Sequence, residues 1–220
     1  IMKKLNVTFV VPNYKWADDD THTYWIYVPY GIVLLAATVR DICNVTIVDA
    51  YVNDLSEEEV TKQIKDTNPD IVGITCLMDQ YGSTGHKVAE LVKNIDNNII
   101  TIYGGVYATI NPLIVVADDN VDYVAVGEGE DLFRDFVLHF SGEGELPFRG
   151  LVYKENGEII NRGSAPMVKD LDNLPRPAYD LIDMEKYISH KPREGTIGAP
   201  PELPYFRMLT SRGCPYDCTF

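Results

Sequence analysis

Positive charge and cysteine are both scarce in this 220-residue sequence. Lysine and arginine together number 19 against 33 aspartates and glutamates, which gives a formal net charge of −14. A chain with this balance repels a phosphodiester backbone, so we expect no nucleic-acid partner. Of the four cysteines, Cys43 and Cys76 lie in apolar runs where a free buried thiol is the ordinary state, and this usage indicates a reducing compartment.

Long apolar runs are missing as well. No stretch reaches the length of a transmembrane helix, and the N-terminus has no apolar signal core separate from the first expected strand. We therefore expect a cytoplasmic protein without a membrane partner. The residues that are present, 45% hydrophobic and 24% charged, are enough for one full core and some peripheral structure.

Short β-rich runs alternate with helical patterns along residues 1–143. Helices are expected from Pro29, after a Ser56 cap with Glu59 three residues on, and over 85–95 and 131–140. Strands are expected at 5–11, 45–48, 71–76, 99–103 and 121–126. Because strands separated by helices pair in parallel, this order predicts a doubly wound, flavodoxin-like α/β domain with a five-stranded parallel sheet.

The pattern changes beyond residue 143. For residues 144–206 we predict a hairpin at Asn156-Gly157, a proline-punctuated linker over 171–177 and a short helix over 181–187. For residues 207–220 we predict a strand at 208–211 that begins a second, incomplete unit. The expected divisions are therefore 1–143, 144–206 and 207–220.

Four loops should meet at the carboxyl edge of the predicted sheet, where doubly wound domains bind their ligands. The candidate cofactor-binding residues in these loops are Asn13, Tyr14, Thr75, Cys76, Leu77, Gly104, Gly105, Val106, Tyr107, Gly127, Glu128 and Gly129. Aromatic side chains should crowd the same edge and could pack a large flat ligand, namely Tyr14, Tyr24, Trp25, Tyr27, Tyr30, Tyr81 and Tyr107. A purely structural alternative stays open for each loop, such as a helix start for 127–130 whose carboxylates complement the helix dipole.

The sequence ends in Arg212-Gly213-Cys214-Pro215-Tyr216-Asp217-Cys218-Thr219-Phe220. Cys214 and Cys218 are the first two cysteines of a C-x3-C-x2-C pattern whose third would directly follow Phe220. Three such thiolates can hold three irons of a [4Fe-4S] cluster and leave the fourth iron open for S-adenosylmethionine. This ending resembles the opening of the radical-SAM superfamily, and we interpret it as an incomplete [4Fe-4S] site. The alternative is two cysteines in a surface loop, or a disulfide.

A second resemblance starts from Thr75-x-Leu77, followed after 26 residues by Gly104-Gly105. This pattern resembles that of cobalamin-binding domains, in which such residues line the slot for the nucleotide tail of the corrinoid. A hydroxyl can bond a ring nitrogen, and glycines let a ring approach the backbone. Residues 28–32 with Ala36-Ala37, and residues 127–130, also look like this family. Together with residues 171–177 and the cysteine motif, these stretches resemble the cobalamin-binding radical-SAM family over nearly the whole chain. The resemblance implies a B12-binding type of fold, bound cobalamin, and a radical-SAM barrel as partner.

The lower cobalt ligand is a separate question. A D-x-H-x-x-G motif supplies a histidine ligand in the best-known cobalamin domains, and here Asp20-Thr21-His22 is followed by Trp25 in place of the glycine. We therefore expect base-off cobalamin with no histidine lower ligand.

Three hypotheses follow, in order of preference. The first is the cobalamin-binding N-terminal portion of a radical-SAM methyltransferase acting on an unreactive carbon, with cyclisation or rearrangement as other outcomes. The second is a docking or substrate-presenting module that binds no corrinoid. The third is a flavodoxin-like or receiver-type module, which lacks support because no acidic cluster follows strand one and no lysine follows strand five.

Overall fold

The computed structural model describes residues 4–17, 26–77, 81–190, 202–206, 208–214, 216 and 218. The strands are β1 (Asn6–Val11), β2 (Asn44–Asp49), β3 (Ile71–Thr75), β4 (Ile100–Gly104), β5 (Tyr123–Ala125), β6 (Leu151–Glu155) and β7 (Glu158–Asn161). The helices are α1 (Tyr30–Val39), α2 (Glu57–Thr67), α3 (Gly82–Ile95), α4 (Val106–Ile110), α5 (Pro112–Ala117), α6 (Glu130–Ser141) and α7 (Met184–Ile188). Short 3-10 turns cover Tyr14–Trp16, Leu171–Asn173 and Tyr179–Leu181.

The strands form one sheet in the order β2-β1-β3-β4-β5-β6-β7. The first five pair in parallel, so the predicted doubly wound α/β sheet of five parallel strands is confirmed. The order reverses at β1, which has β2 on one side and β3 on the other. In sheets of this kind the crevice for ligands lies at the carboxyl ends of the strands beside that reversal.

The predicted hairpin is present, with Asn156 and Gly157 both at positive φ in its turn. It is not separate from the sheet, because β6 pairs antiparallel with β5 and β7 pairs with β6. The hairpin thus extends the sheet to seven strands and covers the edge that β5 would otherwise expose. The division of the chain at residue 143 stays a prediction.

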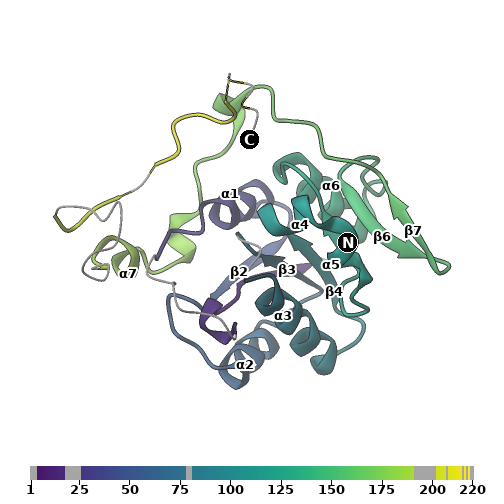
Figure 1. The fold of residues 1–220 in the computed structure, drawn as a ribbon, viewed down its shortest axis with the longest axis horizontal. Coiled ribbons are helices and arrows are strands. Elements are labelled where there is room, and N and C mark those ends of the chain that lie inside the picture. Colours follow the sequence, from purple (N-terminus) through teal and green to yellow (C-terminus); the bar gives the residue numbers. More distant parts are fainter. Residues whose placement is uncertain are drawn as a thin grey trace.

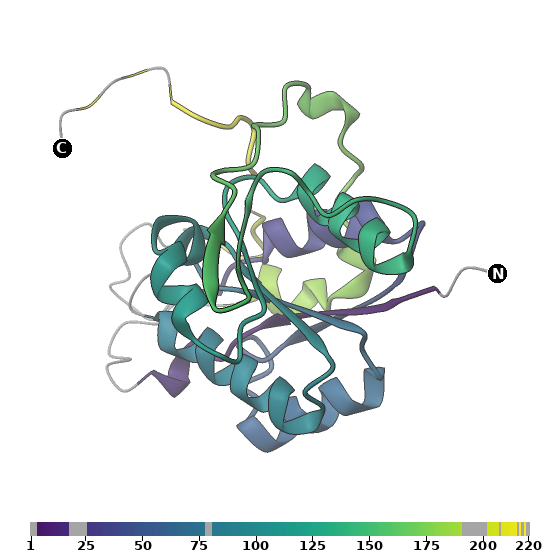
Figure 2. The same cartoon turned by 90° about the vertical axis from the view of Figure 1, so that its right-hand side faces the viewer.

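Helices cover both faces of the sheet (Figure 1). Helices α1 and α6 pack on one face, over a core that includes Phe9, Phe133 and Phe136. Helices α2 and α3 pack on the other, with α5 beside them, over Val72, Ile74 and their neighbours. Figure 2 shows the same arrangement from the side, with the strands between the two groups of helices. In the described part of the chain, no helix is long and apolar enough to cross a membrane.

A local sequence signal explains where α2 begins. Ser56 accepts from the Glu59 amide at 3.3 Å while the Glu59 carboxylate accepts from the Ser56 amide at 2.8 Å, which confirms the predicted capping box of α2. Helices α4 and α5 were not predicted, since they are short and follow a glycine pair typical of a turn.

One expected element is wrong. Residues 208–211 have no regular secondary structure, although the sequence predicted a strand there. A strand exists only beside a hydrogen-bonded neighbour, and no described residue pairs with this segment.

Candidate cofactor site

A cavity of about 760 Å³ lies at the carboxyl edge of the sheet. Its floor comes from the ends of β1, β2 and β3, and its walls come from the start of α1, the turn before α4, and described residues within 179–188 and 205–212. The lining is mostly apolar and aromatic. Its residues are Val11, Tyr14, Ile26, Tyr27, Val28, Pro29, Tyr30, Gly31, Ile32, Asp49, Tyr51, Thr75, Cys76, Leu77, Gly105, Val106, Tyr179, Tyr187, Ile188, Tyr205, Phe206, Met208, Leu209 and Arg212.

The end of β3 lies in the floor, and the end of β4 lies directly beside it, because Thr75 pairs with Gly104. Gly105 has a φ of +91°, and a Cβ there would lie 2.6 Å from the Cys76 carbonyl oxygen and 2.9 Å from Thr75 Oγ1. Only glycine fits this conformation and this approach without a shift of the main chain. The structure therefore brings the separated Thr75-x-Leu77 and Gly104-Gly105 motifs into contact, as the sequence predicted.

Tyrosine rings gather around the cavity. Tyr14 stacks on Tyr81 with ring centroids 4.7 Å apart, and it lies 4.9 Å from the Tyr51 ring. Burial raises the pKa of the Tyr14 hydroxyl above its usual range, so the phenol stays neutral. Among the predicted aromatics, Tyr27 and Tyr30 also line the cavity, whereas Tyr81 and Tyr107 belong to the core. Tyr24 and Trp25 lie outside the described residues.

Asp49, at the end of β2, is one of two charged side chains that line the described cavity. It is buried, it accepts a hydrogen bond from the Tyr187 hydroxyl, and it accepts another from the Val52 amide at 3.0 Å. Burial raises the pKa of the Asp49 carboxyl, and the Tyr187 hydrogen bond opposes that shift. The pair ties α7 to the sheet, helped by Lys186, which donates to Asn53.

Arg212 is the other charged lining residue, and it is held by the loop after β5. Its guanidinium forms an ion pair with Glu128 at 3.3 Å and a second ion pair with Glu130. Glu128 also accepts a hydrogen bond from the Val168 amide. These carboxylates raise the pKa of Arg212 further, with the Glu130 hydrogen bond as the main cause.

Six of the twelve candidate residues line the cavity: Tyr14, Thr75, Cys76, Leu77, Gly105 and Val106. Asn13 instead caps the Tyr14–Trp16 turn and donates to Asp54 and to the Leu55 carbonyl. Tyr107 packs in the core, and Gly104 lies directly beside the floor. The other three candidates, Gly127, Glu128 and Gly129, do not line the cavity. Glu128 forms an ion pair with the lining residue Arg212, and a Cβ on Gly127 would meet Ser164 Oγ at 2.5 Å.

Several lining residues were not predicted, namely Asp49, Tyr51, Tyr179, Tyr187 and Tyr205. Asp49 carried a usable signal, because it ends a predicted strand at the edge where ligands bind. The other four carried little signal. Tyr187, for instance, lies 138 residues from its partner Asp49, and pairing at such a distance follows from tertiary packing alone.

The four cysteines divide into two kinds. Cys43 and Cys76 are buried thiols, as predicted, and burial raises the pKa of the Cys43 thiol to about 12. Cys214 and Cys218 are free and exposed at the end of the segment that walls the cavity. Within the described ranges, no three or more side chains of the His, Cys, Asp and Glu types form a group that could hold a metal ion.

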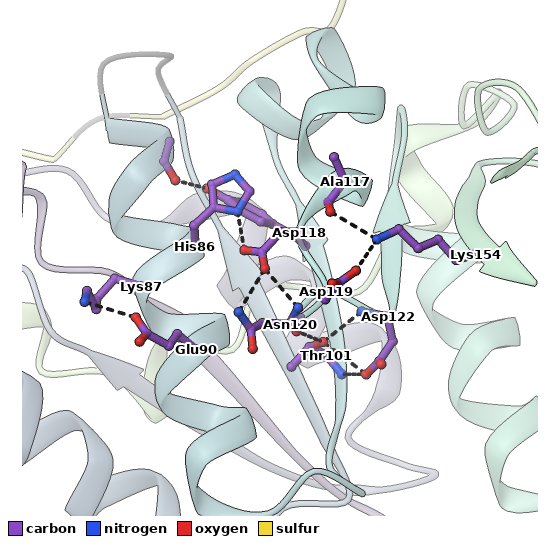
Figure 3. A network of polar contacts seen from close by, with 12 residues as sticks. His86, Lys87, Glu90, Thr101, Ala117, Asp118, Asp119, Asn120, Asp122 and Lys154 are labelled. Carbon is purple, nitrogen blue, oxygen red and sulfur yellow. Dashed lines mark hydrogen bonds and ion pairs between the residues drawn. The ribbon is translucent and has the colours of Figure 1, made fainter. Parts of the chain in front are cut away.

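A second hollow, of about 370 Å³, lies at the opposite, amino end of the strands. Its charges are already paired: Lys93 donates to Asp122 at 2.7 Å, and Lys154 donates to Asp119 at 2.6 Å. Figure 3 shows part of this network, in which Asp122 also accepts from the Thr101 amide at 2.8 Å. Such closed pairing is typical of structural polar networks.

The B12-binding domain family matches residues 21–137, just over half of the sequence. The chain therefore belongs to the B12-binding domain family, which confirms the resemblance inferred from Thr75, Leu77 and the glycine pair.

Two curated relatives extend the match. An uncharacterized methyltransferase of Pyrococcus horikoshii is 36% identical over 194 residues, which are 87% of this chain and 40% of that protein. An anaerobic magnesium-protoporphyrin IX monomethyl ester cyclase of Rubrivivax gelatinosus is 27% identical over 98% of this chain and 38% of its own length. The chain thus spans about 40% of the length of these relatives.

Two solved structures share the fold. OxsB, a cobalamin-dependent S-adenosylmethionine radical enzyme with aqua-cobalamin and S-adenosylmethionine bound, superposes with a TM-score of 0.68 at 20% identity over 84% of this chain and 25% of that one. The methyltransferase TsrM of Kitasatospora setae, with cobalamin and a [4Fe-4S] cluster bound, gives a TM-score of 0.59 at 15% identity over 79% of this chain and 31% of that one. These likenesses concern the fold.

Proposed function

We propose that this chain binds cobalamin in the cavity at the carboxyl edge of its sheet. The observation that carries the proposal is the contact of Gly105 with Thr75 and Cys76, which leaves bare backbone and one hydroxyl in the floor of an apolar cavity. A volume of about 760 Å³ lies within the range of small-molecule sites. The family match supports the same ligand.

Each feature of the cavity suits part of a corrinoid. The Thr75 hydroxyl would bond a nitrogen of the nucleotide base, and Gly105 would let that ring approach the backbone. The tyrosines would pack against the apolar edge of the macrocycle. Bound cobalamin would supply a cobalt centre that accepts and passes on a methyl group.

Gel filtration with absorbance detection, after incubation with hydroxocobalamin, tests the proposal. Co-elution of corrinoid absorbance with the protein is the expected result. Protein that elutes without corrinoid would overturn it and favour the docking module instead. One observation favours that docking function. Helices α4 and α5, which follow the glycine pair, carry four exposed apolar side chains that a protein partner could cover, namely Val106, Ile110, Leu113 and Ile114.

We further propose that no histidine of this chain binds the lower face of cobalt. The described histidines are His86, His139 and His190, and none of the three lines the cavity. His86 bonds Asp118 at 2.7 Å, and His139 bonds the Gly144 carbonyl at 3.0 Å. His22, in the partial motif, lies outside the described residues. His22→Ala should leave the spectrum of bound Co(II) cobalamin unchanged, whereas loss of an imidazole nitrogen hyperfine pattern would contradict the proposal.

The whole protein is proposed to be a cytoplasmic radical S-adenosylmethionine enzyme in which Cys214 and Cys218 supply two of three cluster thiolates. Methyl transfer to an unreactive carbon is the preferred reaction and cyclisation is the alternative, since relatives carry both names. A longer chain that includes the next cysteine and the barrel should bind about four irons on anaerobic reconstitution. Cys214→Ala should abolish that binding; a full iron content in the variant would contradict the assignment.

A further inference from the structure

Residues 127–130, which are the loop after β5 and the first residue of α6, form two ion pairs with a single arginine of the C-terminal segment. Arg212 bonds Glu128 through one guanidinium nitrogen and Glu130 through the other. Glu130 is 6% exposed, and its second carboxylate oxygen finds no partner among the described residues. Arg212 is therefore the counter-ion of this buried carboxylate among the described residues, and its loss would leave a buried carboxylate without an ion pair, which is costly.

The loop that makes these ion pairs is itself fixed on several sides. The Gly127 amide donates to Thr109 Oγ1 at 3.1 Å, and Glu128 accepts from the Val168 amide. A Cβ on Gly129 would lie 3.1 Å from Leu35 of α1, so glycine allows the loop to lie against that helix. The two carboxylates are thus presented from a position that α1, α4 and the segment near Val168 all define.

Arg212 connects this loop to both parts of the proposed site. Its side chain lines the cofactor cavity, and Cys214 follows it by two residues. An extended chain advances at most about 3.6 Å per residue, so the Cα of Cys214 cannot lie more than about 7 Å from that of Arg212. Whatever fixes Arg212 therefore confines the first cysteine to the neighbourhood of the cavity.

We propose that Glu128 and Glu130 form an anchor for Arg212 that positions Cys214 at the mouth of the cofactor cavity. The anchor rests on the proposed function for its purpose, but its existence depends only on the three side chains. These glutamates are positioning residues, a role different from the cofactor contact that the sequence predicted for Gly127, Glu128 and Gly129. Arginine suits the task because its planar fork bonds two carboxylates at once, which a lysine ammonium cannot reproduce.

A nitroxide probe on Cys214 tests the anchor without any activity measurement. In a Cys218→Ser background, Cys214 is the exposed thiol, while Cys43 and Cys76 are buried and should not react. The unaltered anchor should give a slow-motion component in the resonance spectrum. Glu130→Gln and Arg212→Lys should each remove that component, with Glu128→Gln as a milder version because Glu128 is less buried.

Asp119→Asn is the matched control. It makes the same kind of charge-removing change in a more exposed ion pair, Lys154 to Asp119 at 2.6 Å, at the amino end of the sheet. This variant should leave the Cys214 spectrum unchanged. Unfolding curves for all variants identify any that fail to fold; if Glu130→Gln does, Arg212→Lys and Glu128→Gln still decide. A spectrum that stays slow in folded Arg212→Lys and Glu128→Gln would overturn the anchor.

Co(II) cobalamin, added to the labelled protein, separates the anchor from the proposed function. Dipolar broadening of the nitroxide by Co(II) in the wild-type background, lost in Arg212→Lys, is expected if the cavity holds the corrinoid. Absence of broadening in the wild type, together with the mobility changes described above, would leave the anchor standing and remove the cofactor role. Broadening that persists unchanged in Arg212→Lys would show that the anchor does not position Cys214.

Discussion

The two ends of the sheet differ in how many charged side chains they carry. At the amino end, lysines and aspartates fill a small polar hollow and satisfy one another, as Lys93 does with Asp122 and Lys154 with Asp119. At the carboxyl end, a cavity twice as large is lined by rings and backbone, with Asp49 and Arg212 as its charged side chains within the described chain. The first arrangement stabilises the fold, whereas the second leaves room for a ligand.

This contrast separates two effects that mutations often mix. A change at the amino end should alter the free energy of unfolding and leave cobalamin affinity alone. A change in the floor of the carboxyl-end cavity should alter cobalamin affinity. It should alter the free energy of unfolding only where the new side chain would collide with the backbone, as at Gly105. The predictions below test that separation.

The largest effect is expected at Gly105. Gly105→Ala forces a Cβ to within 2.6 Å of the Cys76 carbonyl oxygen at a φ of +91°, so it should lower the unfolding free energy by about 3 kcal/mol and abolish cobalamin binding. Gly104→Ala is the control, because its Cβ meets nothing closer than Ala125 Cβ at 3.5 Å. Urea denaturation and a hydroxocobalamin titration measure both quantities. Equal stability of Gly105→Ala and Gly104→Ala would contradict the assigned backbone contact.

Lys93→Met should produce the opposite profile. Lys93 is 9% exposed and donates to Asp122, to the Ile99 carbonyl at 2.8 Å and to the Asn97 carbonyl at 3.2 Å. Its removal takes this donor from the two carbonyls and the counter-ion from Asp122, which keeps its hydrogen bonds from Thr101. The loss should cost about 2 kcal/mol, limited by those remaining bonds and by the partial exposure of Asp122. Cobalamin affinity should not change. Lys87→Met, which breaks an exposed pair with Glu90, should change neither quantity measurably.

The sequence predicted the parallel strands, the α2 cap and the floor motif because each depends on neighbouring residues or on a fixed strand-to-strand spacing. It could not predict α4 and α5, whose exposed Ile110, Leu113 and Ile114 break the usual apolar-inside periodicity. The part of the cavity wall that residues 179–188 and 205–212 form could not be predicted either. Tyr187 contacts Asp49 at the end of β2, and Arg212 contacts Glu130 at the start of α6, across 138 and 82 residues of sequence. No local pattern encodes such pairings.

Asp49 offers a pH test of the wall that α7 forms. Burial raises the pKa of Asp49, so the folded state holds its proton to a higher pH than the unfolded chain does. The unfolding free energy should therefore decrease as the pH rises from the unfolded value of about 4 through the raised value. Asp49→Asn should remove this decrease in urea titrations at a series of pH values. Tyr187→Phe should enlarge it, because the Tyr187 hydrogen bond lowers the pKa of Asp49; a parallel pH dependence in all three proteins would show that Asp49 does not titrate in this way.

Thr75→Val should give the smallest effect and the cleanest one. Valine keeps the shape of threonine and removes the hydroxyl, so a lost hydrogen bond to the nucleotide base should weaken cobalamin binding about fivefold, or about 1 kcal/mol. Stability should stay within about 0.5 kcal/mol, because the structure shows no hydrogen bond from the Thr75 hydroxyl to another described residue. Thr8→Val makes the same chemical change in β1, where the Thr8 hydroxyl is buried and bonds Thr67 at 2.7 Å. That variant should lose stability and keep its affinity, and if both variants lost stability alone, the Thr75 hydroxyl would belong to the fold and not to the cofactor site.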